Sequence, residues 1–367
     1  MRGLILFLAC LWLAACQGAT SHCGSTRFAF PERQLTAPDL SEVQPPNPGD
    51  VAPALARQLE QQWQDFASRE DIADLGIAVV GPEGFWASPE NEATPRFYWA
   101  SVGKLFTSVV LQQLVQEGHL SLDEALVRWY PQLPDADRIT VNALLSHRSG
   151  FASHSEFEAF RDRDTPVTPE EVVEFLGDRP LLFCPGTDWY YSNSGYLLLG
   201  RIIEAITGRD YVDNIRTRIA EPIDTPSIEA LPQGARPADV ALMANADGTK
   251  TMAPGDPFSA GNIVATPTDM LRFFVAVLQG RLTGGAALSS MTADLYPMFD
   301  AGLFYGEGIM VYELPDDLWV GHSGGTPGTR AIIAYSFARK TYLAVALTGS
   351  GSAESVSNRI FQLLAHP

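Results

Sequence analysis

The chain is poor in positive charge. Its 25 lysine and arginine residues face 43 aspartate and glutamate residues, so the formal net charge is −18 at neutral pH. A surface with this excess of negative charge repels nucleic-acid phosphates and anionic lipid headgroups, which excludes nucleic-acid binding and membrane binding through a basic surface. Internal repeats and low-complexity tracts are also missing from the 367 residues. The mixed composition at this length predicts a globular protein with a large core, long enough for two intertwined subdomains.

Histidine is scarce and scattered. The six histidines lie at positions 22, 119, 147, 154, 322 and 366, and these spacings are not those of a metal-binding motif. We therefore expect neither a metal ion nor another cofactor.

The chain opens with an apolar run at residues 4–15. The run is too short to span a bilayer stably and is typical of a signal peptide, which we place at residues 1–15. Leu13-Ala14-Ala15-Cys16 resembles the bacterial lipobox, which implies cleavage before Cys16 and acylation of that cysteine. The alternative is ordinary signal cleavage that leaves Cys16 as a thiol. Gln17, rather than aspartate, follows, which resembles the sorting pattern for the outer membrane. The predicted location is the cell envelope, with the protein facing the periplasm.

Cysteine is used sparingly, and three of the four cysteines remain after processing. If Cys16 carries lipid, Cys23 and Cys184 form an even pair in an oxidising compartment, which predicts a disulfide between them. The alternative is two unpaired thiols, one of them buried.

A polar segment separates this anchor from the rest of the chain. Residues 16–49 are dotted with prolines, and Pro45-Pro46-Asn47-Pro48-Gly49 lies near the end of the segment. This composition predicts a tether, with the folded domain at residues 50–367.

Strands are predicted near both ends of the domain. Residues 76–80 and 85–87 form one expected hairpin, and residues 331–335 and 342–347 form a second strand pair, followed by a terminal helix at 355–365. A first helix precedes them, with its apolar stripe at Leu55, Leu59, Trp63 and Phe66. The middle is mostly helical, with start signals at Thr168 and Thr266. The sequence therefore predicts an α+β fold, in which helices flank one antiparallel sheet built from both chain ends and a mainly helical subdomain is inserted.

The first motif that carries chemistry is Ser101-x-x-Lys104. Apolar residues after Lys104 recur at helical spacing, which predicts a buried helix ending near Gly118. Residues three apart on a helix are neighbours, so the lysine amine can reach the serine oxygen. Burial would lower the pKa of Lys104 toward neutrality and let it act as a base. The alternative is an ordinary helix start with a serine cap and a solvated lysine.

Two further motifs follow. Tyr191-Ser192-Asn193 offers a phenol that could carry a proton if neighbouring cations lower its pKa, and an amide that could accept from the lysine and donate to a substrate. Gly321-His322-Ser323-Gly324 precedes a strand, and its glycines would let a substrate lie close to a strand edge. The alternatives are a tyrosine packed in a turn with Asn193 capping a helix, and a glycine-rich loop with an incidental histidine.

These three motifs, in this order, resemble the serine β-lactamase and penicillin-binding-protein superfamily, in its branch of class C β-lactamases, DD-carboxypeptidases and esterases. The resemblance implies a β-lactamase/transpeptidase-like fold, Ser101 as acylated nucleophile, Lys104 as its base and Tyr191 as proton shuttle. It also implies substrate binding by Asn193 and by His322, Ser323 and Gly324. The oxyanion hole would combine the Ser101 N–H with a backbone N–H on the strand after the His322 motif.

The third motif departs from the Lys-Thr/Ser-Gly pattern of most β-lactamases, because His322 stands where lysine is usual. A histidine of ordinary pKa would attract a substrate carboxylate only on the acid side of neutrality. The predicted function is DD-carboxypeptidase-like or β-lactamase-like hydrolysis through an acyl-enzyme, with a peptidoglycan peptide, a β-lactam or an ester as substrate. Two alternatives remain: a carboxylesterase on the same fold, and a catalytically silent peptide-binding protein.

Overall fold

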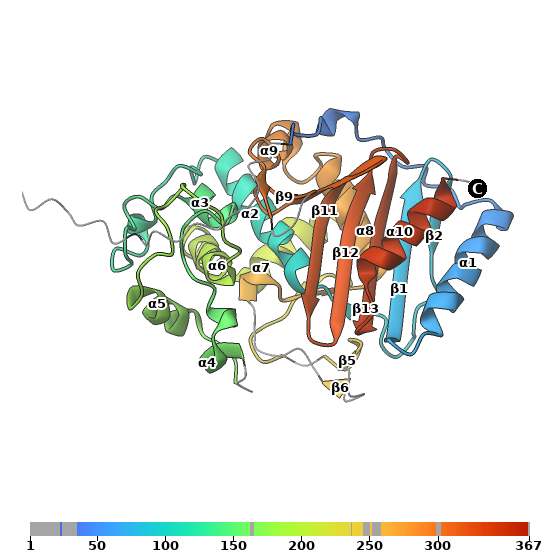
Figure 1. Ribbon diagram of the computed structural model, residues 1–367, viewed down its shortest axis with the longest axis horizontal. Helices are drawn as coiled ribbons and strands as arrows, with labels where there is room; N and C mark the ends of the chain where they lie inside the picture. Colours follow the sequence, from blue (N-terminus) through green and yellow to red (C-terminus); the bar gives the residue numbers. More distant parts are fainter. Residues whose placement is uncertain are drawn as a thin grey trace, which may run out of the picture.

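The computed structural model describes residues 23, 35–161, 165–235, 237–244, 250–251, 258–298 and 302–365. Figure 1 shows a sheet on one side and a cluster of helices on the other. The helices are α1 Pro53–Ala67, α2 Gly103–Gln116, α3 Val141–Leu145, α4 Glu158–Arg161, α5 Pro169–Gly177, α6 Asn193–Thr207, α7 Tyr211–Ile215, α8 Pro267–Leu278, α9 Gly284–Met291 and α10 Ala353–Leu364. Those of the middle of the chain, α2 to α7, make up most of the helical cluster.

The main sheet has eight strands in the order β2-β1-β13-β12-β11-β10-β9-β8, and its neighbours pair antiparallel. The strands from the N-terminal part of the chain join those from its C-terminal part where β1 pairs with β13. This pairing confirms the predicted antiparallel sheet built from both chain ends. Its strands are β1 Ile72–Gly81, β2 Gly84–Ala87, β8 Tyr296–Pro297, β9 Leu303–Tyr305, β10 Met310–Leu314, β11 Asp317–Thr326, β12 Thr329–Ser336 and β13 Thr341–Gly349. Two small sheets are formed by β3 Phe97–Tyr98, β4 Glu229–Ala230 and β7 Ile263–Ala265, and by β5 Met243–Ala244 and β6 Lys250–Thr251.

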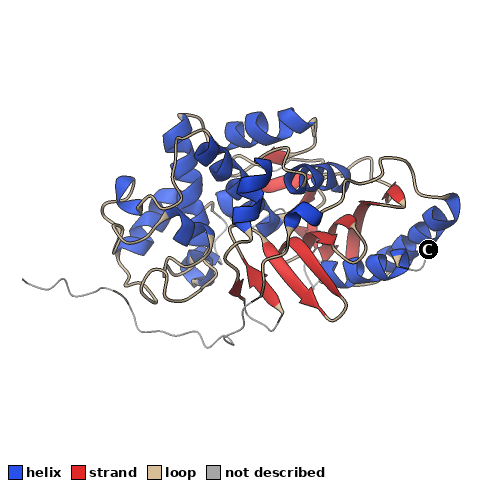
Figure 2. Ribbon diagram, turned by 90° about the horizontal axis from the view of Figure 1, so that it is seen from above, coloured by secondary structure: helices blue, strands red, loops and turns tan. Residues whose placement is uncertain are grey.

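Both faces of the sheet are covered. Helices α1 and α10 pack on one face, while α8 packs on the other, toward the helical region (Figures 1 and 2). The predicted stripe of α1 explains its docking, because Leu55, Leu59 and Phe66 are buried and the Trp63 indole N–H donates to Leu75 O at 3.0 Å. Sheet residues alternate between the two cores, as strand geometry requires.

The residues predicted to begin and end helices do so in the structure. Thr168 and Glu171 form a capping box at the start of α5, and Thr266 caps α8 through the Asp269 N–H. Gly118 follows α2 with φ of +75°, a conformation that suits glycine and ends the helix near the predicted position.

The predicted tether is corrected by the structure. Residues 35–49 pack against the domain, because Leu40 and Val43 are buried and the backbone of Gln44 bonds the phenols of Tyr335 and Tyr342. The packed segment therefore begins before Asp50, and in the described residues it includes Leu35. The predicted signal peptide at residues 1–15 and Cys16 lie outside the described residues.

A disulfide joins Cys23 to Cys184, and their Cα atoms are 4.8 Å apart. Cys23 also forms a parallel β-bridge with Leu181. The predicted pairing is thus the one present in the structure, and it attaches the N-terminal segment to the stretch that precedes Tyr191.

In the described part of the chain, none of the helices combines the length and apolar character needed to cross a bilayer. Within the same residues, no three histidine, cysteine, aspartate or glutamate side chains converge as metal ligands would.

Candidate active site

Ser101 lies in a single 3-10 turn, Ala100–Val102, that runs directly into α2. Nearly all of α2 is buried between the sheet side and the helical region, so it is a core helix, as its apolar spacing predicts. Ser101 itself is half-buried, whereas Lys104, one helical turn further on, is fully buried. The turn therefore presents the serine at the surface of the core and the lysine beneath it.

Lys104 makes three hydrogen bonds. Its Nζ lies 3.1 Å from Ser101 Oγ, 2.7 Å from Asn193 Oδ1 and 2.8 Å from Ala260 O. Burial lowers the pKa of Lys104 well below its usual value. A neutral amine can donate its two protons to the amide and carbonyl oxygens and keep its lone pair for the Ser101 hydroxyl. The geometry thus fits a lysine that accepts a proton from serine.

Tyr191 completes this group. Its phenol forms a hydrogen bond with Ser101, and its ring centroid lies 4.8 Å from Lys104 Nζ. Burial raises the pKa of Tyr191, and the bond to Ser101 offsets only part of that effect. The condition that neighbouring cations lower this pKa is not met, because Lys104 beside it is itself buried and has a lowered pKa. Tyr191 is therefore a protonated phenol in the free protein and fits a proton donor.

Asn193 is fixed by hydrogen bonds of both its side chain and its backbone. Ser192, not Asn193, caps α6, since its Oγ accepts from the Gly195 N–H. The Asn193 side chain accepts from Lys104 and donates from Nδ2 to Ser155 Oγ at 2.8 Å, while its backbone N–H donates to Ser153 Oγ at 3.1 Å. Among the described residues, no acceptor takes the second Nδ2 proton, which can therefore meet a substrate.

Several residues of the site escaped the sequence analysis. Ser153 and Ser155 fix Asn193, and the Ala260 carbonyl fixes Lys104. His147 is fully buried, its ring centroid lies 4.2 Å from that of Tyr191, and its Nδ1 accepts from the Ser192 N–H at 3.1 Å. His147 lies in a Ser-His-Arg-Ser-Gly stretch, a sequence pattern that could have identified it as a site residue. No sequence pattern points to the two serines or to the Ala260 carbonyl.

His322 is buried and is not available to a substrate charge. Its cross-strand partner is Ile333, which belongs to the core. Its Nδ1 lies 2.6 Å from Ser323 O and its Nε2 3.1 Å from the Tyr305 hydroxyl. Burial, with a smaller contribution from Lys104, lowers the pKa of His322 to about 3. The prediction that His322 binds a carboxylate through its charge is therefore wrong, because the imidazole is neutral near pH 7 and both nitrogens have partners.

The third motif forms part of strand β11 rather than a loop. Pairing with β10 ends at Gly321, so residues 322–326 pair with β12 alone and leave their other edge open. A Cβ on Gly324 would lie 2.4 Å from Trp99 O and 2.8 Å from Ser101 N, so glycine is required for this close approach. Strand β11, which contains the third motif, therefore faces Ser101. This corrects the expectation that the strand after the motif supplies the N–H of the oxyanion hole.

The register of the β11–β12 hairpin directs one backbone N–H of β11 toward the open edge near Ser101. Thr326 and Thr329 flank a two-residue turn, and Gly325 pairs with Arg330 in the next position. The residues closing such a turn exchange their hydrogen bonds, so the next residue directs its N–H away from the partner strand. The Gly325 N–H therefore points to the open edge, where it and the Ser101 N–H can meet a carbonyl oxygen.

The same stretch, Gly321-His322-Ser323-Gly324-Gly325, also matches the Gly-x-Ser-x-Gly pattern of another hydrolase class. That pattern needs a sharp turn between a strand and a helix. Ser323 lies within β11 instead, with Oγ 3.7 Å from the Met310 sulfur. The match is therefore a coincidence of composition.

An aromatic and methionine-rich cluster lies beside Tyr191. Buried members are Trp189, Met298, Tyr305 and Met310, with Tyr296 and Tyr312 packed against them. The cluster supplies an apolar wall next to the polar group around Ser101.

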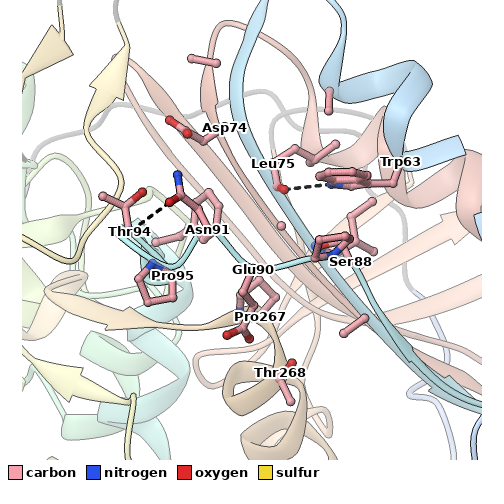
Figure 3. A pocket seen from close by; sticks show the side chains of 17 residues that line it. Trp63, Asp74, Leu75, Ser88, Glu90, Asn91, Thr94, Pro95, Pro267 and Thr268 are labelled. Atoms are coloured by element: carbon pink, nitrogen blue, oxygen red, sulfur yellow. Dashed lines mark hydrogen bonds between the residues drawn. The ribbon is translucent and has the colours of Figure 1, made fainter. Parts of the chain in front are cut away.

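A separate cavity of about 250 Å³ opens elsewhere, at one end of β1 (Figure 3). Trp63, Leu75, Glu90 and Pro267 are among its lining residues, and the Trp63–Leu75 hydrogen bond crosses one wall. Neither Ser101, Lys104 nor Tyr191 lines it, so we do not assign the cavity to the chemistry.

Comparisons with known proteins agree with this geometry. A family model described as Beta-lactamase matches residues 77–366. Penicillin-binding protein 4 of Amycolatopsis lactamdurans is 28% identical over 340 residues, which cover 85% of this chain and 84% of that protein. The structure is similar to a D-stereospecific amidohydrolase from Streptomyces sp., with TM-score 0.73, 26% identity and coverage of 83% and 98% of the two chains. It is also similar to a D-amino acid amidase from Ochrobactrum anthropi SV3 complexed with L-phenylalanine amide, with TM-score 0.75, 26% identity and coverage of 85% and 99%.

The match covers the sheet and the helical region together, and it includes every strand and helix that positions Ser101. The fold of the two amidases agrees with the predicted α+β fold. The chain belongs to the β-lactamase family, within the superfamily of serine β-lactamases and penicillin-binding proteins.

Proposed function

We propose that the protein is a serine hydrolase that forms an acyl-enzyme on Ser101 and cleaves peptides ending in D-alanine, as a DD-carboxypeptidase does. The observation that carries the proposal is the contact between a fully buried Lys104 amine and Ser101 Oγ, 3.1 Å apart. Such an amine can remove the serine proton at neutral pH, which an exposed lysine cannot do.

Acylation follows from the roles of four groups. Lys104 accepts the hydroxyl proton as Ser101 Oγ attacks the scissile carbonyl carbon. The N–H groups of Ser101 and Gly325 stabilise the negative oxygen that develops. Tyr191 donates its proton to the leaving nitrogen as the carbon–nitrogen bond breaks, and it recovers a proton from Lys104. The leaving amine thus carries the former Tyr191 proton, Tyr191 holds the proton that came from the serine, and Ser101 carries the acyl group.

Deacylation reverses these roles with water as the nucleophile. Lys104 and Tyr191 again accept and pass the proton while water attacks the ester carbonyl, and Ser101 leaves with a proton restored. Asn193 and Ala260 hold the lysine beside Ser101 in the free protein, so the same amine can serve both steps without a large rearrangement.

The substrate class is supported by what the similar proteins are named for. Both similar structures act on D-configured compounds by their titles, and the similar sequence is a penicillin-binding protein. The D configuration is the feature that the titles of the two similar structures share.

A carboxylesterase is the second candidate, and one observation favours it. His322, which stands in place of the usual lysine, is neutral and buried, so it offers no charge to a peptide carboxylate. A silent binding protein is less well supported, because the Ser101–Lys104–Tyr191 group is complete.

Lipid anchoring at Cys16 remains part of the proposal and would hold the protein at the envelope. The intact mass of the mature protein tests it. A mass matching a chain that begins at acylated Cys16 supports the anchor, and an unmodified thiol at that position contradicts it.

The decisive experiment compares three substrates: a fluorescent penicillin, a short-chain nitrophenyl ester and an N-acylated D-alanyl-D-alanine. Mass spectrometry of the quenched reactions locates the adduct, which we expect on Ser101. Release of D-alanine identifies a carboxypeptidase, whereas turnover of the ester alone identifies the esterase. An adduct on any other residue, or none with all three compounds, contradicts the proposal.

A further inference from the structure

His147 lies at the end of α3, in a turn where glycine is the usual residue. Its φ is +61°, in the left-handed region. Its N–H donates to Leu144 O at 3.3 Å, and the N–H of Arg148 donates to Ala143 O at 2.7 Å. This pair of bonds is the one that ends many helices, with glycine or asparagine at the left-handed position. Because a larger side chain is disfavoured there, contacts of the imidazole must offset the conformational cost.

His147 bonds the backbone on both sides of Tyr191. Its carbonyl oxygen accepts from the Tyr190 N–H at 2.9 Å, and its Nδ1 accepts from the Ser192 N–H at 3.1 Å. Residues 189–192 belong to no helix or strand, and α6 begins directly after them. Since no regular element fixes this stretch, the two bonds to His147 help to set where the Tyr191 backbone lies.

The imidazole also packs on the Tyr191 side chain. The two ring centroids are 4.2 Å apart, and the ring planes are inclined by 36°. Tyr196 and Tyr305 lie beside the imidazole as well, with ring centroids 5.1 and 4.6 Å from its own, and His147 is buried. Because a protein interior is close-packed, this arrangement limits how far the Tyr191 ring can swing away from Ser101.

The same contacts determine where the imidazole carries its proton. A ring nitrogen that accepts a hydrogen bond has no proton, so the neutral ring is protonated at Nε2. Burial, with smaller contributions from Lys104 and His322, lowers the pKa of His147 well below its usual value. In the part of the chain that the structure describes, Nε2 has no hydrogen-bond partner. The polar contact that the ring supplies is therefore the one at Nδ1.

We propose that His147 is a positioning residue for Tyr191, which it holds in place for proton donation by bonding the peptide groups on both sides and packing on the phenol ring. The contact that this arrangement preserves is the hydrogen bond between the Tyr191 phenol and Ser101. The inference rests on the proposed acyl-enzyme chemistry and deepens it, because it assigns the geometry of the proton donor to a residue outside the Ser101–Lys104–Tyr191 group.

The test uses the methyl ester and the nitrophenyl ester of N-acetyl-D-alanine, which give the same acyl-enzyme. The methoxide oxygen must take the Tyr191 proton and leave as methanol, whereas nitrophenolate is a stable anion near neutral pH and needs no proton. The ratio of kcat/KM for the methyl ester to that for the nitrophenyl ester therefore reports proton donation. This ratio does not depend on how much of the enzyme is folded, and it can be measured for a peptidase or an esterase.

Tyr191→Phe calibrates the ratio and should lower it about a hundredfold or more, because the proton donor is lost. His147→Gly suits the left-handed turn but removes the imidazole. It should lower the ratio about ten- to a hundredfold, since a displacement of about 1 Å can cost that much. His147→Asn also suits the turn and keeps an oxygen that can accept from the Ser192 N–H, so it should recover part of the loss. In the Tyr191→Phe background, His147→Gly should not change the ratio further.

Tyr342→Phe is the matched control, because it removes a buried phenol of β13 that accepts from Gln279 Nε2 at 2.7 Å and keeps the ring. Its ratio should equal that of the unchanged protein. Equal losses on both esters in His147→Gly, or a further fall of the ratio in the double variant, would overturn the inference alone and leave His147 as a support of the fold. An unchanged ratio in Tyr191→Phe, or no adduct on Ser101, would overturn the proposed function and this inference together.

Discussion

The Asn193 amide oxygen lies 2.7 Å from Lys104 Nζ, closer than the 3.1 Å that separates this nitrogen from Ser101 Oγ. Asn193 is itself fixed by Ser153 and Ser155. These contacts hold the amine beside the serine. Burial lowers the pKa of Lys104 and so favours its neutral form.

The first prediction separates the two serines that flank the site. Ser101→Ala should abolish acylation and turnover, because it removes the attacking oxygen. Ser192→Ala should retain acylation and lower the free energy of unfolding by about 1 kcal/mol, since Ser192 caps α6. Labelling with fluorescent penicillin, together with urea unfolding, measures both effects. Persistent labelling of Ser101→Ala would refute the assignment.

The second prediction concerns the cost of burying Lys104. Its folded pKa is lowered, so between that value and about 10.4 the unfolded chain binds one more proton than the folded chain. Stability should therefore rise with pH across this window, by about 1.4 kcal/mol per pH unit for this group. Lys104→Met lacks the effect.

Urea unfolding of the unchanged protein and of Lys104→Met at several pH values from 6 to 9 gives the comparison. The unfolding free energy of the unchanged protein minus that of Lys104→Met should increase as pH rises. A difference independent of pH would mean that Lys104 stays protonated when folded, and the general-base role would fall with it.

Much of the fold could be predicted because its signals are local. The α1 stripe, the capping box at Thr168 and the apolar run after Lys104 each act within a few residues. The Ser101–Lys104 contact was predictable for the same reason, since helical spacing alone brings the two side chains together.

What could not be predicted depends on contacts between distant segments. Residues 35–49 have a loop's composition, yet Leu40 and Val43 fill gaps that exist only once the sheet has formed. His322 sits in a polar motif, but its strand position turns it toward Ile333 and the Tyr305 hydroxyl. Its burial, and hence its lost charge, follows from strand alternation within a sheet whose register the sequence does not show.

The third prediction follows from that burial. With a pKa of about 3, His322 is neutral throughout pH 6–8. KM for a D-alanine-terminated peptide should therefore stay level over this range, as should KM for a neutral ester. Steady-state kinetics under slow acylation gives both values. A rise in the peptide KM centred near pH 6.5, lost in His322→Gln, would restore His322 as the carboxylate-binding group.

The fourth prediction concerns the disulfide. Cys23 and Cys184 are 161 residues apart, so their bond closes a long loop and should stabilise the fold by up to about 5 kcal/mol in the chain-entropy description. Cys184→Ser should lower the melting temperature, and dithiothreitol should lower that of the unchanged protein but not that of the variant. Non-reducing peptide maps should recover the linked peptides. Two free thiols at these positions would contradict the pairing.

The last prediction concerns Glu307, a buried carboxyl that packs behind α2. Ser108 of α2 donates to its backbone oxygen, and Gln112 and Asn142 donate to its side chain at 2.6 and 3.2 Å. Burial raises the pKa of Glu307 to about 7. Between about 4.5 and 7 the folded chain therefore holds a proton that the unfolded chain has lost, so this group's contribution to stability declines as pH rises through that window.

Glu307→Gln removes the titration but keeps the shape and an oxygen that can accept from Gln112. The variant should match the unchanged protein near pH 4.5 and be more stable at pH 8, by about 3 kcal/mol at most. Urea unfolding across pH 4.5–8 measures the divergence, and Glu354→Gln, an exposed carboxyl on α10, is the control that should not diverge. If the unfolding free energies of Glu307→Gln and of the unchanged protein ran parallel across this pH range, Glu307 would be ionised in the folded protein. The Gln112 and Asn142 amides would then stabilise its negative charge.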